Sequence, residues 1–104
     1  MTNFIQGKVI IITGAGGGFG RLIAQKAAAL GGKIVCADID ETGLIETVRS
    51  VRAQGSEVSY VIASVAALDQ MQEVAAHAVK THGSIDVMIN NAGTMPLAFF
   101  ADHK

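Results

Sequence analysis

The chain has 104 residues, which is enough for one domain with one hydrophobic core. Half of the residues are hydrophobic, 16% are charged, 12 are glycine and one is proline, a balance that excludes a disordered or disulfide-rich chain and is typical of a sheet covered on both faces. The formal net charge of -1 leaves no basic surface for nucleic acid or anionic lipid, so we expect neither as a partner.

The N-terminal residues 1–8 contain no apolar signal core, and no segment approaches the roughly 20 apolar residues of a membrane span. The one cysteine, Cys36, lies in an apolar stretch, where we expect a reduced, buried thiol and neither a disulfide nor a metal ligand. We therefore predict no membrane segment and a cytoplasmic location.

The first half of the chain reads as strand, helix, strand. Residues 8–13 form a β-branched run typical of a central parallel strand, and residues 33–38 form a second short apolar run. The helix between them ends at Gly31 and Gly32. The face that we expect this helix to bury consists of Phe19, Leu22, Ile23, Lys26, Ala27 and Leu30.

The second half repeats this alternation. Asp40 is placed to cap a helix that ends near Gly55 and buries Leu44, Val48 and Val51. Residues 57–62 predict a third strand and residues 85–90 a fourth. The helix between them stops at Gly83, and its expected buried face is Leu68, Met71, Val74, Ala75, Ala78 and Val79.

Strands that alternate with helices of this length require right-handed crossovers and a mainly parallel sheet. The predicted fold class is therefore α/β, a Rossmann-type three-layer α/β/α arrangement with strand order 3-2-1-4. Residues 91–104 have room for a turn and a short tail only, so we expect the sheet to stop after the fourth strand. No repeat or linker divides the chain, and residues 1–104 are predicted to form one domain.

Residues 13–20 read TGAGGGFG and lie between the first predicted strand and the first predicted helix, the context of a phosphate-binding turn. Gly14 allows a tight exit from the strand, Gly18 allows the main chain to approach a diphosphate, and Gly20 allows the helix to pack close to the sheet. The helix N-terminus presents N–H groups and a partial positive charge to the phosphates. The segment has neither the common G-x-G-x-x-G spacing nor the Lys-Ser/Thr pair of a P-loop. The alternative to a phosphate-binding turn is a merely flexible glycine loop.

Asp38 ends the second predicted strand, about 20 residues past the glycines. A carboxylate there can accept hydrogen bonds from both hydroxyls of the adenosine ribose, whereas the 2′-phosphate of NADP would meet a like charge. The two features together predict NAD(H) as the cofactor. For Asp38 taken alone, the alternative is a solvated turn residue beside Asp40.

The pattern T-G-x-x-x-G-x-G at residues 13–20 and the sequence Asn-Asn-Ala-Gly at residues 90–93 resemble the short-chain dehydrogenase/reductase family. The resemblance covers essentially the whole chain and implies an oxidoreductase that transfers hydride between a nicotinamide and an alcohol or carbonyl group. The cofactor-binding residues predicted from the turn, from Asp38 and from the resemblance are Gly14, Gly17, Gly18, Phe19, Gly20, Asp38, Ile39, Ser64, Val65, Asn91, Ala92 and Gly93.

Within this set, the resemblance places the glycines and Phe19 around the diphosphate, Asp38 and Ile39 at the adenosine, and residues 91–93 in the cofactor cleft. Asn90 is expected to stabilise the sheet instead. One departure concerns Ser64, followed by Val65, at a position where family members often carry an acidic residue that binds the adenine amine. An uncharged hydroxyl there predicts a weaker adenine contact.

A second departure concerns catalysis, because the family's catalytic Ser and Tyr-x-x-x-Lys pair lie beyond the Asn-Asn-Ala-Gly segment, after which this chain has eleven residues. Tyr60 is no substitute, since it lies on the third strand and the fourth residue after it is Ser64. His77 and His82 fall on a predicted helix, where we expect surface or hydrogen-bonded side chains. Reduction of a carbonyl needs a proton donor, so we expect no catalytic residue and no activity from this chain alone.

Three functions stay open: part of an oxidoreductase, a non-catalytic NAD-binding module that regulates an assembly, and a folded fragment whose cofactor site is too incomplete to bind well. The fourth strand is expected to present an unpaired edge, which favours pairing with another chain. We therefore predict self-association through this strand, with the apolar segment at residues 96–100 packed at the junction.

Overall fold

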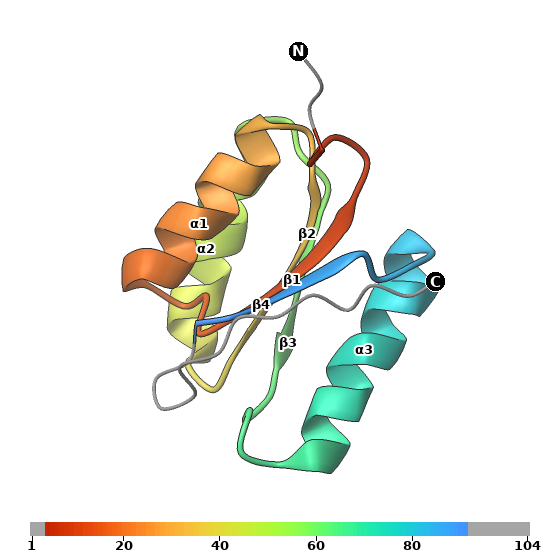
Figure 1. The fold of residues 1–104 in the computed structure, drawn as a ribbon. Coiled ribbons are helices and arrows are strands. Elements are labelled where there is room, and N and C mark those ends of the chain that lie inside the picture. Colours follow the sequence, from red (N-terminus) through yellow and green to blue (C-terminus); the bar gives the residue numbers. More distant parts are fainter. Residues whose placement is uncertain (1–3, 92–104) are drawn as a thin grey trace.

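The computed structural model describes residues 4–91, and within them strands and helices alternate without exception (Figure 1). In chain order the elements are β1 (Val9–Thr13), α1 (Gly18–Ala29), β2 (Lys33–Asp38), α2 (Glu41–Arg52), β3 (Val58–Ile62), α3 (Leu68–His82) and β4 (Val87–Asn90). The predicted alternation is confirmed. Three strands begin one or two residues later than predicted, since Lys8, Glu57 and Ile85 lie outside them.

The four strands are parallel and follow the order β3-β2-β1-β4, which confirms the predicted topology. Thr13, the last residue of β1, lies opposite Ala37 of β2 and Asn90 of β4. All five residues of β1 are buried, because this strand has a neighbour on each side and helices on both faces. Because the strands are parallel, their carboxyl ends lie at the same edge of the sheet.

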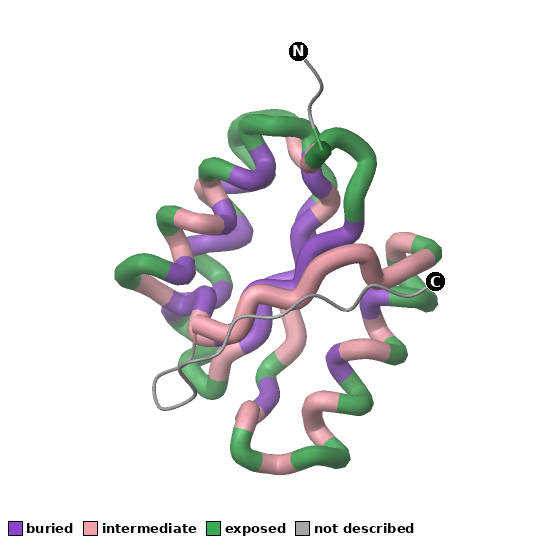
Figure 2. Tube along the Cα trace, viewed as in Figure 1, coloured by how far each residue is buried: buried purple, intermediate pink, exposed green. Residues whose placement is uncertain are grey.

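The chain forms the three layers that the sequence predicts, with α1 and α2 on one face of the sheet and α3 on the other (Figure 1). Figure 2 shows that burial is concentrated along the sheet and on the helix sides that face it. Alternate residues of β1 enter opposite cores: Ile10 and Ile12 pack with α1 and α2, whereas Val9 and Ile11 pack with α3. The central strand thus contributes to two cores at once.

The buried face of α1 differs from the predicted one, and the prediction was wrong for Phe19, Leu22 and Leu30, which are 74%, 47% and 50% exposed. The residues that α1 buries are small: Gly20, Ala24, Ala27 and Ala28. This helix is apolar on several sides, so hydrophobicity alone does not select a face. Close approach to the sheet does select one, because only small side chains fit there.

The helix ends follow the predicted signals. Asp40 caps α2, with its carboxylate accepting a hydrogen bond from the Gly43 N–H at 3.1 Å. Gly83 ends α3 in the left-handed conformation, with φ of 98°. The predicted face of α2 is buried in full. On α3 only Val74 and Ala78 of the predicted face are fully buried, and the prediction was wrong for Leu68 and Val79, which are 74% and 51% exposed.

Cys36 is buried in β2, as predicted, and burial raises the pKa of its thiol from 9.0 to about 12. The thiolate form is thus strongly disfavoured at neutral pH, and the side chain acts as a small apolar core residue. Across residues 4–91, none of the helices combines the length and the apolar character needed to cross a bilayer.

A hydrogen-bonded cluster joins β3 to α3. The Ser59 hydroxyl lies 2.8 Å from His77 Nε2 and 3.0 Å from His82 Nε2. The His82 side chain is only 3% exposed, and its Nδ1 lies 3.5 Å from the Glu57 carboxylate. Both histidines thus fit the predicted structural role, although His82 is more enclosed than a surface residue. The pKa of His77 is lowered from 6.5 by burial and by the positive charges of His82 and Lys80.

This shift makes stability depend on pH. Below about pH 6.5 the unfolded chain takes up a proton at His77 that the folded chain resists. The free energy of unfolding should therefore fall as the pH drops through that value and level off below the folded-state pKa. His77→Gln should remove this component. In urea denaturation, the free energy of unfolding of the variant minus that of the parent should therefore increase as the pH is lowered from 7.5 to 5.5. A constant difference between the two proteins would contradict this expectation.

Candidate functional site

The glycine turn, residues 14–17, connects β1 to α1 at the carboxyl edge of the sheet. Gly14 and Gly18 have φ of +65° and +56°, the left-handed region that favours glycine. A methyl group on Gly20 would collide with the carbonyl oxygen of Gly14, so the first turn of α1 lies directly against the glycine turn. Two of the roles assigned from sequence, the tight exit and the close helix packing, have this geometric basis.

The N-terminus of α1 has no side-chain cap and no acidic residue in its first turn. Its cap residue, Gly17, supplies no side-chain hydrogen bond, and the first turn contains no acidic residue. The N–H groups at this end therefore have no carboxylate or hydroxyl of the first turn as a partner. Such N–H groups, together with the helix dipole, favour the oxygens of a phosphate.

Asp38 lies beside the glycine turn, as the sequence predicts. One carboxylate oxygen accepts a hydrogen bond from the Gly16 N–H at 2.8 Å. The other accepts from the N–H groups of Ile39 and Asp40 at 2.7 and 3.1 Å. A carboxylate offers about four acceptor positions. Three are thus held by the main chain, which fixes the orientation of the side chain and leaves about one for a donor from outside the protein.

A cavity of about 370 Å³ opens at this edge of the sheet. Its lining residues come from the ends of all four strands: Gly14, Asp38, Ile39, Ala63, Ser64, Val65 and Asn91. The volume lies within the range of small-molecule sites, and a carboxylate faces largely apolar walls, a combination that suits a nucleoside. The position, outside the carboxyl ends of parallel strands, is where open α/β sheets bind ligands.

Thr13 joins the ends of β1 and β4. Its hydroxyl lies 2.9 Å from Asn90 Oδ1 and accepts a hydrogen bond from the Asn91 N–H, also at 2.9 Å. The Asn91 side-chain amide donates to the carbonyl oxygen of Gly14 at 3.4 Å. Asn90 therefore has the sheet-stabilising role expected of it, and Asn91 is held against the glycine turn.

The structure brings most of the predicted site residues to one edge of the sheet. Ser64 and Val65 line the cavity, but the Ser64 hydroxyl already accepts a hydrogen bond from the Ala66 N–H at 3.1 Å. Phe19 is exposed at the first turn of α1. Ala92 and Gly93 lie outside the described residues, as does the segment 96–100.

Sequence reasoning missed the residues that support the glycine turn from α2. A methyl group on Gly43 would collide with the carbonyl oxygen of Gly16, and the fully buried Thr47 hydroxyl donates to the carbonyl oxygen of Ala15 at 2.7 Å. Arg21 reaches the same region from α1. The available signal was Thr47 itself, a polar residue three positions from Leu44 on the buried face of α2.

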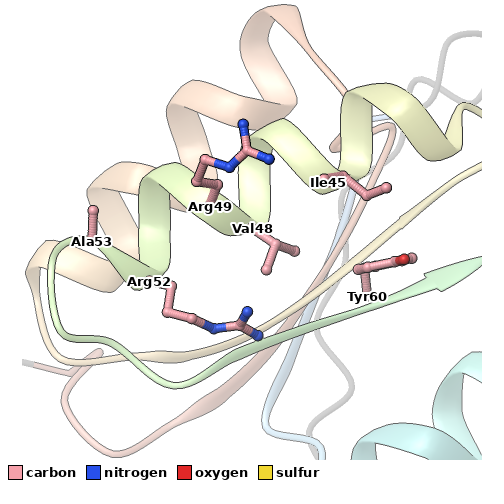
Figure 3. Close-up of a pocket in the computed structure, with 6 residues that line it drawn as sticks. All are labelled: Ile45, Val48, Arg49, Arg52, Ala53 and Tyr60. Carbon is pink, nitrogen blue, oxygen red and sulfur yellow. The ribbon is translucent and has the colours of Figure 1, made fainter.

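A larger cavity of about 460 Å³ lies between α2 and β3 (Figure 3). Its lining residues are Ile45, Val48, Arg49, Arg52, Ala53 and Tyr60, none of which was predicted to bind cofactor. Two of its polar side chains have protein partners: Arg52 donates to the carbonyl oxygen of Val58 at 3.3 Å, and the Tyr60 hydroxyl donates to Glu41 at 3.4 Å. We therefore place the candidate site at the glycine turn.

Residues 8–104 match the family model described as short chain dehydrogenase. The chain belongs to the short-chain dehydrogenase family. This membership confirms the resemblance seen in the two sequence motifs and agrees with the parallel sheet and its strand order.

Relatives of this short-chain dehydrogenase chain include several oxidoreductases. It is 42% identical over 86 residues to a CLA biosynthesis dehydrogenase/reductase of Lactiplantibacillus plantarum, covering 83% of this chain and 30% of the relative. It is 40% identical over 86 residues to a diacetyl reductase of Staphylococcus epidermidis, covering 83% and 34%. The chain thus spans about a third of the length of the curated relatives it matches.

Solved structures agree in fold. A short-chain dehydrogenase/reductase from Burkholderia phymatum in complex with NAD matches with a TM-score of 0.79 and 45% identity, over 85% of this chain and 31% of that one. A metagenomic short-chain oxidoreductase in complex with NADP matches with a TM-score of 0.80 and 32% identity, over 86% and 41%. Proteins similar to this chain therefore include both NAD and NADP complexes.

The contact between Gly43 and the glycine turn leads to a stability prediction. Alanine normally stabilises a helix relative to glycine by about 1 kcal/mol. Gly43→Ala should instead lower the free energy of unfolding by roughly 1 to 3 kcal/mol, because the new methyl group collides with the Gly16 carbonyl oxygen. Chemical denaturation measures the change. Thr42→Ala, at an exposed position of the same turn, is the control and should change stability by less than about 0.5 kcal/mol. A stabilised Gly43→Ala protein would show that the close approach is absent.

Proposed function

We propose that this chain is the NAD(H)-binding part of an oxidoreductase that transfers hydride between a nicotinamide and an alcohol or carbonyl group. The observation that carries the proposal is the Asp38 carboxylate held 2.8 Å from the Gly16 N–H, beside an uncapped helix N-terminus. The carboxylate can accept a hydrogen bond from a sugar hydroxyl, and the N–H groups at the helix N-terminus can donate to phosphate oxygens. An adenosine diphosphate moiety requires both. Family membership supports the same class of chemistry.

The proposed residue roles follow the geometry of the site. The diphosphate would lie against Gly14, Gly17, Gly18, Phe19 and Gly20, at the N-terminus of α1. The adenosine would lie in the 370 Å³ cavity, with its ribose on Asp38 and its base between Ile39, Ser64 and Val65. Asn91, Ala92 and Gly93 would continue the cleft toward the nicotinamide. When bound, the nicotinamide supplies the hydride donor or acceptor.

We propose NAD(H) over NADP(H) because of the charge on Asp38. Three main-chain N–H groups donate hydrogen bonds to this carboxylate and fix its position. A ribose hydroxyl can donate to the remaining acceptor position, whereas a 2′-phosphate would face a like charge at short range. We also propose a cytoplasmic location, which suits the buried, reduced Cys36.

We propose that the 104 residues bind cofactor without turnover. Carbonyl reduction needs a proton donor near the nicotinamide, and the Tyr-x-x-x-Lys pair that the family resemblance implies has no counterpart in this sequence. The chain should therefore leave NADH absorbance unchanged with carbonyl substrates such as diacetyl. Protein-dependent NADH oxidation would overturn this part of the proposal.

Titration calorimetry with Asp38 variants tests the cofactor assignment. Asp38→Ala should weaken NAD⁺ binding by about tenfold or more, since it removes a charge-assisted hydrogen bond worth roughly 1.5 to 3 kcal/mol. NADP⁺ should lose less affinity than NAD⁺, because the like charge disappears as well. Asp40→Asn is the matched control, since it removes a neighbouring charge, keeps the α2 cap and should bind NAD⁺ as the parent does. Equal NAD⁺ affinity of Asp38→Ala and the parent would remove Asp38 from the site.

We further propose that this polypeptide self-associates through β4. Within residues 4–91, β4 is hydrogen-bonded to one strand, β1, and all four of its residues are only half-buried. A strand edge of this kind can pair with the same edge of a second copy. Sedimentation velocity at micromolar concentration should show a dimer or larger species that dissociates on dilution. A monomer over the whole concentration range would contradict the proposal.

A further inference from the structure

Three of the four residues in the glycine turn are glycine, which makes the turn flexible unless something restrains it. Glycine loses more conformational freedom on ordering than any other residue, and binding would have to supply that free energy if the turn were mobile. A turn that recognises a diphosphate by its main chain therefore benefits from restraint on its protein side. The structure contains such a restraint, formed by side chains that lie behind the turn.

Two side chains provide this restraint by donating hydrogen bonds to consecutive carbonyl oxygens of the turn. The Thr47 hydroxyl donates to the carbonyl oxygen of Ala15 at 2.7 Å. The Arg21 guanidinium donates to the carbonyl oxygen of Gly16 at 2.8 Å through Nη2, which also lies 3.2 Å from the carbonyl oxygen of Gly43. Peptide units of the turn are thus tied to both α1 and α2.

The two side chains also hold each other. Arg21 Nε donates to the Thr47 hydroxyl at 2.8 Å, so this hydroxyl accepts one hydrogen bond while it donates another. Thr47 is fully buried. Glu46 lies 3.5 Å from the guanidinium and partly balances its charge. Loss of either side chain would leave carbonyl oxygens of the turn without these donors.

The geometry of the peptide group relates these contacts to ligand recognition. No cis peptide bond occurs in the described residues, and in a trans peptide the C=O and the following N–H point in opposite directions. The Ala15 carbonyl points at Thr47, and the Gly16 N–H accordingly points at Asp38, 2.8 Å away. The Gly16 carbonyl points at Arg21, so the Gly17 N–H must point away from Arg21.

We infer that Arg21 and Thr47 are positioning residues, which hold the glycine turn in its dinucleotide-binding conformation without touching the ligand. This inference rests on the proposed NAD(H) function. Thr47 sets the peptide unit whose N–H orients the Asp38 carboxylate. Arg21 sets the peptide unit whose N–H, on Gly17, points away from Arg21 at the N-terminus of α1, where the diphosphate is proposed to bind. Adenosine recognition and diphosphate recognition are thereby set by one pair of side chains.

The test measures NAD⁺ affinity by calorimetry for three variants, at a temperature where circular dichroism shows each to be folded. Thr47→Val keeps the shape of the side chain but removes the hydroxyl, and it should weaken NAD⁺ binding by about tenfold. Thr47→Ser restores the hydroxyl and should recover affinity to within about threefold of the parent. Arg21→Lys keeps the positive charge but cannot bridge Gly16 and Thr47, and it should weaken binding by at least about fivefold.

Ser50→Ala is the matched control. Ser50 lies one turn further along α2. Its hydroxyl accepts a hydrogen bond from Gln25 of α1 at 3.1 Å and donates to the main-chain oxygen of Thr47 at 2.8 Å, so it joins the same two helices without contacting the glycine turn or the Thr47 hydroxyl. Its loss should leave NAD⁺ affinity unchanged. In the parent protein, amide hydrogen exchange at Gly16, whose N–H donates to Asp38, should be slow, and Thr47→Val should accelerate it while the amides of β1 stay protected.

The outcomes distinguish failure of the positioning role from failure of the proposed function. If the parent chain does not bind NAD⁺, the proposed function fails. If the parent binds and both Thr47→Val and Arg21→Lys bind equally well, the positioning role is wrong while the function stands. The positioning role is also wrong if Ser50→Ala weakens binding as much as Thr47→Val, because the effect would then reflect general coupling of α1 and α2.

Discussion

The peptide unit between Ala15 and Gly16 connects the candidate site to three parts of the fold. Its oxygen accepts from Thr47 of α2, and its N–H donates to Asp38 at the end of β2. The unit itself continues from β1, and the Ala15 N–H donates to the carbonyl oxygen of Ala37. The position of the carboxylate relative to the glycine turn therefore depends on how α2 packs against the sheet. A small shift of α2 would alter both hydrogen bonds.

Small residues make this arrangement possible. Gly20 on α1 and Gly43 on α2 each lie so close to the glycine turn that a single methyl group would collide with a main-chain oxygen. The two helices thus approach the turn from different sides at main-chain contact distance. This constraint also explains which side of α1 is buried. The large apolar residues Phe19, Leu22 and Leu30 remain exposed, because the fully buried side of α1 consists of glycine and alanine, with Ile23 packed at its border.

Family membership and geometry contribute different parts of the functional argument. Membership defines the class of chemistry, and relatives of this chain occur with either NAD or NADP, so it does not choose the nucleotide. The local charge at Asp38 provides the argument for NAD(H). The chain spans about a third of the length of these relatives, and the geometry at Asp38 supports the proposal about the cofactor alone.

The sequence by itself determined the elements and their order, because hydrophobic periodicity and helix-end signals such as Asp40 and Gly83 are local properties. It also determined the glycine turn and Asp38, since each occupies a fixed place relative to a strand end. Only the tertiary structure decided which face of α1 is buried and that Arg21 and Thr47 hold the turn. The reason is that these features depend on distances between segments that local patterns do not encode. Thr47 lies 32 residues from Ala15 along the chain, and its contact with the glycine turn exists only when packing brings the two together.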